Sequence, residues 1–94
     1  MMERTGDRVE VSGAMIIACA REQLRAGERQ LGQGARVFDL AGVSEVDSAG
    51  LSIVFGWQRV AARSGTEIRI ANPPPSFLTL AELYGVADLL PLVD

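Results

Sequence analysis

The chain has no histidine and no lysine, and it has one cysteine, Cys19. Without histidine, neither a Ser-His-Asp nor a Cys-His catalytic arrangement can form, and zinc sites built from Cys and His are excluded. Without lysine, there is no phosphate-binding loop of the kind that ends in Gly-Lys-Ser/Thr. A single cysteine cannot form an internal disulfide, and we therefore expect a cytoplasmic protein.

Positive charge is also scarce. Nine arginines stand against 12 acidic residues, which gives a net charge of −3, and they form no basic run. Nucleic acid requires a concentrated positive patch, so we expect no nucleic-acid partner.

The densest early apolar run, 14–20, is far shorter than the about 20 residues that span a bilayer, so no direct membrane insertion is expected. The 94 residues indicate a single domain, 1–94, with little room for a buried cofactor, and we expect none.

Apolar periodicity and turn residues predict alternating strands and helices. Strands are expected at 1–4, 8–12, 35–40 and 67–71, helices at 14–31, 48–63 and 76–85, a loop at 41–46, and a last apolar piece at 89–93. In the third helix, Ser76 is the expected N-cap and Gly85 the expected C-cap. This order favours an α/β fold in which helices pack mainly on one face of a mixed sheet with parallel centre strands.

The most informative stretch is the start of the 48–63 helix. Asp47 is a good N-cap, and Ser48 then lies where free N–H groups and the helix dipole favour negative charge. A helical wheel places the small residues Ser48, Ser52 and Gly56 on one strip. The strip is flanked by Arg59 and by two apolar residues that we expect to be partly exposed, Ile53 and Val60. This combination predicts a docking surface, and the flanking apolar pair could also join two copies as a homodimer.

Two simpler interpretations stay open. Ser48 and Asp47 are common residues at any helix start, whatever the function. The carboxylates of Asp39, Glu45 and Asp47 could instead hold Mg²⁺ through oxygen ligands and support an enzyme.

Three segments carry a family resemblance: Val37-Phe38-Asp39-Leu40, Val46-Asp47-Ser48-Ala49-Gly50-Leu51 and Leu80-Ala81-Glu82-Leu83-Tyr84-Gly85-Val86. Together they resemble the STAS domains of sulfate transporters and anti-sigma-factor antagonists. The resemblance implies the SpoIIAA-like STAS fold, a four-stranded mixed sheet with helices mainly on one face. It also implies a non-catalytic role in protein binding rather than an enzyme.

The resemblance implies two alternative partners. In the MlaB-type branch, the position of Ser48 helps to engage the ATPase subunit of a phospholipid ABC transporter, which would place the protein at the inner membrane. In anti-sigma-factor antagonists, an anti-sigma serine kinase phosphorylates the matching serine. Many STAS domains carry Gly-Glu-Leu-Asp where this chain has Gly13-Ala14-Met15-Ile16, and this difference favours the MlaB-like role. The expected partner-binding residues are Asp47, Ser48, Ala49, Gly50, Ser52, Ile53, Gly56 and Arg59, with Ser48 as the phosphorylation site.

Overall fold

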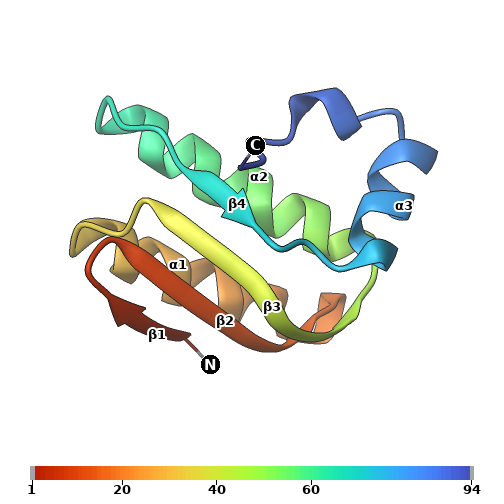
Figure 1. Ribbon diagram of the computed structural model, residues 1–94, viewed down its shortest axis with the longest axis horizontal. Helices are drawn as coiled ribbons and strands as arrows, with labels where there is room; N and C mark the ends of the chain where they lie inside the picture. The colour runs from red at the N-terminus through yellow and green to blue at the C-terminus, as the bar shows by residue number, and fades with distance from the viewer. Residues whose placement is uncertain (1, 94) are drawn as a thin grey trace.

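A four-stranded mixed sheet forms one layer of the computed structural model, which describes residues 2–93 (Figure 1). The strands lie in the order β1-β2-β3-β4. Their bounds are β1 Met2–Thr5, β2 Arg8–Met15, β3 Val37–Val46 and β4 Arg69–Ala71. The β1–β2 hairpin is antiparallel and turns at Gly6, which has φ 63°, whereas β3 pairs in parallel with both of its neighbours.

The helices form the second layer. Figure 1 views the sheet from its uncovered face, with α1 (Ala20–Gly32) and α2 (Ser48–Arg63) behind it and α3 (Pro75–Leu83) at one end. Two short 3-10 turns, η1 (Ile17–Cys19) and η2 (Ala87–Leu89), complete the chain. The predicted α/β fold, with helices mainly on one face of a mixed sheet, is confirmed. No helix within residues 2–93 is long and apolar enough to cross a membrane.

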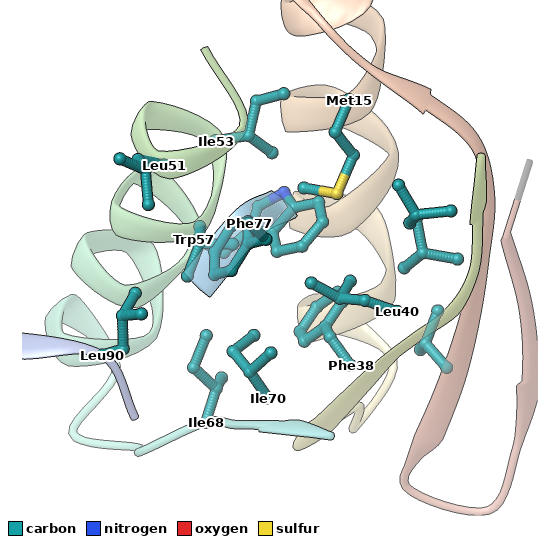
Figure 2. Close-up of a cluster of buried hydrophobic side chains, with 14 of the residues drawn as sticks. Met15, Phe38, Leu40, Leu51, Ile53, Trp57, Ile68, Ile70, Phe77 and Leu90 are labelled. Atoms are coloured by element: carbon teal, nitrogen blue, oxygen red, sulfur yellow. The ribbon is translucent and has the colours of Figure 1, made fainter. Parts of the chain in front are cut away.

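The core lies between the sheet and the two covering helices, and Trp57 of α2 is its largest side chain (Figure 2). Trp57 is fully buried and stacks on Phe38 of β3, with ring centroids 4.4 Å apart. Its Nε1 donates a hydrogen bond to the backbone oxygen of Gln23 in α1 at 3.2 Å. Gly27 of α1 lies directly against the indole, since a Cβ there would be 2.1 Å from Nε1. The absence of a side chain at this position lets α1 and α2 pack closely.

Two predicted boundaries are wrong, and pairing between β2 and β3 explains both. Strand β2 continues to Met15, which pairs with Val46, so α1 begins at Ala20 instead of residue 14. The expected loop at 41–46 is the second half of β3. Gly13 has φ 87°, close to two register shifts in β2 that keep the strand paired to its end. Hydrogen bonds to a distant strand outweigh the local helical spacing of the apolar residues.

The C-terminal segment lies along the free edge of β4. The backbone N–H of Ile70 donates to the Pro91 oxygen at 2.8 Å, and that of Val93 donates to the Ile70 oxygen at 2.9 Å. The expected strand from residue 1 is confirmed from Met2 onward, while Met1 lies outside the described residues. Ser76 does not cap α3, because the N-cap is Pro74 and no side-chain bond forms there. The C-cap is Tyr84 instead of the expected Gly85, which follows it with φ 71°.

Candidate functional site: the groove at the start of α2

Asp47 organises the point where β3 ends and α2 begins. Its Oδ1 accepts a hydrogen bond from the Ala49 N–H at 2.8 Å, which makes it the N-cap of α2, as predicted. Its Oδ2 accepts from the N–H of Ile17, the first residue of η1, at 3.1 Å. Its own N–H donates to the Met15 oxygen at 3.3 Å. This one residue therefore joins the end of β2, the turn that follows it and the start of α2.

Ser48 is the first residue of α2 and is exposed. The first N–H groups of a helix have no partner within the helix, and the helix dipole adds partial positive charge there. A negative group on the Ser48 side chain would thus be tolerated by the domain itself. The same group would change the surface that another protein meets.

A groove of about 590 Å³ opens beside Ser48, between η1, the first two turns of α2 and the residues that follow α3. Ile17 and Tyr84 line it and remain 76% and 57% exposed. The residues that line the groove are Ile17, Ala20, Asp47, Ser48, Ala49, Leu51, Ser52, Phe55, Tyr84 and Val86. Large apolar side chains left open to water around two hydroxyl groups are typical of a surface that contacts another protein.

Half of the predicted partner-binding residues line this groove, namely Asp47, Ser48, Ala49 and Ser52. Ala49 is itself largely buried, and Arg59 is exposed but is not part of the groove lining. The binding role of these residues stays a prediction.

Three of the other predicted residues, Gly50, Ile53 and Gly56, are buried, and the expected partial exposure of Ile53 is wrong. Ile53 has no exposed surface and lies among the core side chains in Figure 2. A Cβ on Gly56 would be 2.5 Å from Cδ2 of Leu24, because α1 packs against this side of α2. A Cβ on Gly50 would be 2.8 Å from Cγ1 of Val46. Ile53 therefore cannot join two copies in the predicted homodimer.

Sequence reasoning missed the two most exposed walls of the groove. Ile17 falls inside the helix expected at 14–31, and Tyr84 inside the one expected at 76–85. Nothing in the sequence indicates that Tyr84 and Ile17 lie at the same end of the molecule.

Asp39 lies on the uncovered face of the sheet, in a network of its own. Its carboxylate accepts hydrogen bonds from Arg8 at 2.9 Å and from Asn72 at 3.1 Å, and also from the Ala41 N–H at 2.9 Å. Burial of the carboxyl raises its pKa, but these three hydrogen bonds and the arginine charge outweigh burial and hold the pKa below its ordinary value. Within residues 2–93 no cluster of three acidic or cysteine side chains could hold a metal ion, so the alternative magnesium site of Asp39, Glu45 and Asp47 is not assembled.

A four-stranded mixed sheet covered by helices on one face, with a serine presented at the start of the second helix, defines a STAS-type domain. The family model described as "Mlab, STAS domain" matches residues 2–93. The chain therefore belongs to the STAS-domain family, as the sequence resemblance predicted.

One sequence relative of the chain belongs to a transport system. The "Intermembrane phospholipid transport system binding protein MlaB" of Haemophilus influenzae (strain ATCC 51907 / DSM 11121 / KW20 / Rd) is 31% identical over 51 residues. That match spans 54% of this chain and about half, 49%, of the relative.

Solved structures share the fold at low identity. An anti-sigma factor antagonist from Mycobacterium paratuberculosis is 21% identical, with a TM-score of 0.73 over 98% of this chain and 81% of that one. The anti-sigma factor antagonist SpoIIAA in its unphosphorylated form is 16% identical, with a TM-score of 0.71 over 100% of this chain and 87% of its own. Its phosphorylated form, described as a Bacillus cell fate determinant, is also 16% identical and gives a TM-score of 0.65 over 100% and 90%.

Proposed function

We propose that this chain is a regulatory subunit that docks through the Ser48 groove onto the ATPase subunit of an ABC-type phospholipid transporter. One observation carries the proposal: an exposed serine at a helix start lies in a groove whose walls, Ile17 and Tyr84, are large and exposed. An apolar segment of the partner would cover these walls, with the hydroxyls of Ser48 and Ser52 facing it. Binding through this groove requires no catalytic group.

The choice of partner class rests on the family and its members. The matching family model carries the name Mlab, and the relative from Haemophilus influenzae is named as part of a phospholipid transport system. In such a system the chain would meet the ATPase subunit on the cytoplasmic side of the inner membrane.

Ser48 is the proposed control point of this contact. A phosphate on its hydroxyl adds a charge of about −1.5 to −2 at pH 7. The helix N-terminus favours that charge, so the domain stays folded. A partner packed over the groove would have to take the same charge out of water, which is costly unless an arginine meets it. Phosphorylation is therefore expected to release the partner.

The decisive experiment is a pull-down of the tagged chain from its source cells, with the captured proteins identified and the intact mass of the chain measured. Capture of a transporter ATPase subunit supports the proposal. The purified ATPase subunit is then titrated with wild type and Ser48→Asp by calorimetry. We expect Ser48→Asp to abolish binding and to shift the melting temperature by no more than a few degrees, because the charge lies at a helix start.

Ser76→Asp is the matched control. It adds the same charge in the first turn of α3, at an exposed serine outside the groove lining. This variant should bind like wild type. If Ser48→Asp binds the ATPase subunit as tightly as Ser76→Asp does, Ser48 is not the control point.

A second candidate is an anti-sigma-factor antagonist, favoured by the exposed hydroxyl of Ser48 and by the shared fold with SpoIIAA in both of its forms. In this role a serine kinase of the anti-sigma type would occupy the groove and phosphorylate Ser48. The same pull-down separates the candidates. Capture of such a kinase, with a chain heavier by one phosphate at Ser48, would replace the transporter proposal.

A further inference from the structure

Ile17, the most exposed wall of the groove, belongs to a turn with little to hold it. The turn η1 has three residues, none of which is buried, and its N-cap residue, Ile16, has no side chain that could accept a capping hydrogen bond. Two backbone bonds close it, from the Cys19 N–H to the Ile16 oxygen at 2.9 Å and from the Ala20 N–H, at the start of α1, to the Ile17 oxygen. A short turn with few buried contacts opens easily unless it is fixed from outside.

The bond that fixes Ile17 comes from Asp47, 30 residues away in the chain. Each oxygen of the carboxylate has its own backbone donor, the Ala49 N–H on Oδ1 and the Ile17 N–H on Oδ2. A helix N-cap requires one acceptor oxygen, and serine or asparagine supplies it about as well as aspartate does. The second oxygen of Asp47 is therefore not needed for capping, and it is the one that reaches the groove wall.

We infer that Asp47 is a positioning residue that fixes the Ile17 wall against the start of α2, so that Ile17 and Ser48 present one rigid surface to a protein partner. The inference rests on the proposed docking function and adds a residue that controls the geometry of the groove. A wall that is already ordered costs less conformational entropy on binding than a mobile one. The Asp47 carboxylate thus raises the affinity for the partner through its hydrogen bond to the Ile17 N–H, and it stabilises α2 through its hydrogen bond to the Ala49 N–H.

Asp47→Asn and Asp47→Ser separate these two roles. Both variants keep a capping oxygen for the Ala49 N–H. Asparagine turns an N–H donor toward the Ile17 N–H, and serine has no second oxygen. Amide hydrogen exchange followed by NMR should show the Ile17 amide at least about tenfold less protected in both variants, with the Ala49 amide unchanged. Affinity for the purified ATPase subunit should fall about tenfold, since the lost bond is one to a charged group.

Asp39→Asn is the matched control, because Asp39 also binds a backbone N–H, that of Ala41, but on the uncovered face of the sheet. It should change neither Ile17 exchange nor affinity. Ile17→Ala supplies the test of mechanism. If Asp47 acts through Ile17, Asp47→Asn should cost no further affinity once Ile17→Ala is present.

The outcomes are distinct. Unchanged Ile17 exchange in Asp47→Asn, or losses of affinity that add fully in the double variant, would overturn the inference. If wild type fails to bind the ATPase subunit, the transporter proposal fails. The exchange measurement needs no partner and still decides whether Asp47 holds the Ile17 wall.

Discussion

Gly27→Ala should destabilise the domain, although alanine is the better helix former. Gly27 lies in α1 against the face of Trp57. An added Cβ would be 2.1 Å from Nε1 and 2.4 Å from Cε2 of the indole. The ring is fully buried and cannot move without disturbing the Phe38 stacking and the hydrogen bond to the Gln23 oxygen.

The magnitude follows from three contributions. Replacing glycine by alanine inside a helix gains about 1 kcal/mol. Overpacking a core costs about 1–3 kcal/mol, and leaving a buried N–H without its acceptor costs about 1–3 kcal/mol more. The net loss is therefore about 3 kcal/mol, which for a domain of this size lowers the melting temperature on the order of 10–20 °C.

Urea and thermal unfolding followed by Trp57 fluorescence measure this directly, because the chain has one tryptophan. Gly32→Ala is the control in the same helix, since a Cβ there would meet nothing within 4 Å. It should leave the domain as stable as wild type or up to about 1 kcal/mol more stable. A Gly27→Ala protein that matched Gly32→Ala in midpoint and emission would refute the close approach of α1 to Trp57.

Two further predictions concern the uncovered face of the sheet. The lowered pKa of Asp39 means that its carboxylate stabilises the fold above the unfolded-state pKa of about 3.9 and that this contribution is lost as pH falls through the lower folded-state pKa. The urea midpoint should therefore drop more between pH 6 and pH 3 for wild type than for Asp39→Asn. An equal drop in the two proteins would show that the hydrogen bonds and the arginine charge at Asp39 do not stabilise the fold. Asn72 has φ 51° and donates to Asp39. Asn72→Ala should lower the free energy of unfolding by about 1–2 kcal/mol, because alanine neither donates to Asp39 nor adopts a positive φ easily. Asn72→Gly should lower it less, since glycine adopts a positive φ without strain. Chemical denaturation of the two variants checks which is the less stable.

Local signals predicted α2 from its first residue to its last. Asp47 caps the start, and the Ser64-Gly65 pair, with Gly65 at φ 70°, ends the helix at Arg63. Such caps depend on residues adjacent in the chain, so the sequence alone reveals them. The second half of β3 could not be predicted in this way, because it is a strand through its pairing with β2.

The candidate site also combines residues that local sequence predicts with residues that only the folded chain brings together. Ser48 and Asp47 belong to one short segment with a recognisable signature, and both were predicted. The walls, Ile17 and Tyr84, come from elements that only the folded chain brings to one groove. The bond from Asp47 to Ile17 likewise joins residues 30 positions apart. Sequence reasoning thus predicted the two residues at the centre of the candidate site but not the exposed side chains around them.

Helix geometry explains why Gly56, the last residue of the small-residue strip, is buried instead of exposed. Residues four apart on an α-helix are rotated by about 40°, so Ser48, Ser52 and Gly56 drift by about 80° around α2. The drift carries the strip from the groove, where the two serines are exposed, to the side where α1 packs. On that side, the missing side chain of Gly56 leaves space that Leu24 of α1 fills, so no other protein can pack there. A small residue early in the strip leaves room for another protein, whereas a small residue further along α2 lets α1 approach. Substitutions at Ser52 should therefore alter binding, and substitutions at Gly56 should alter stability.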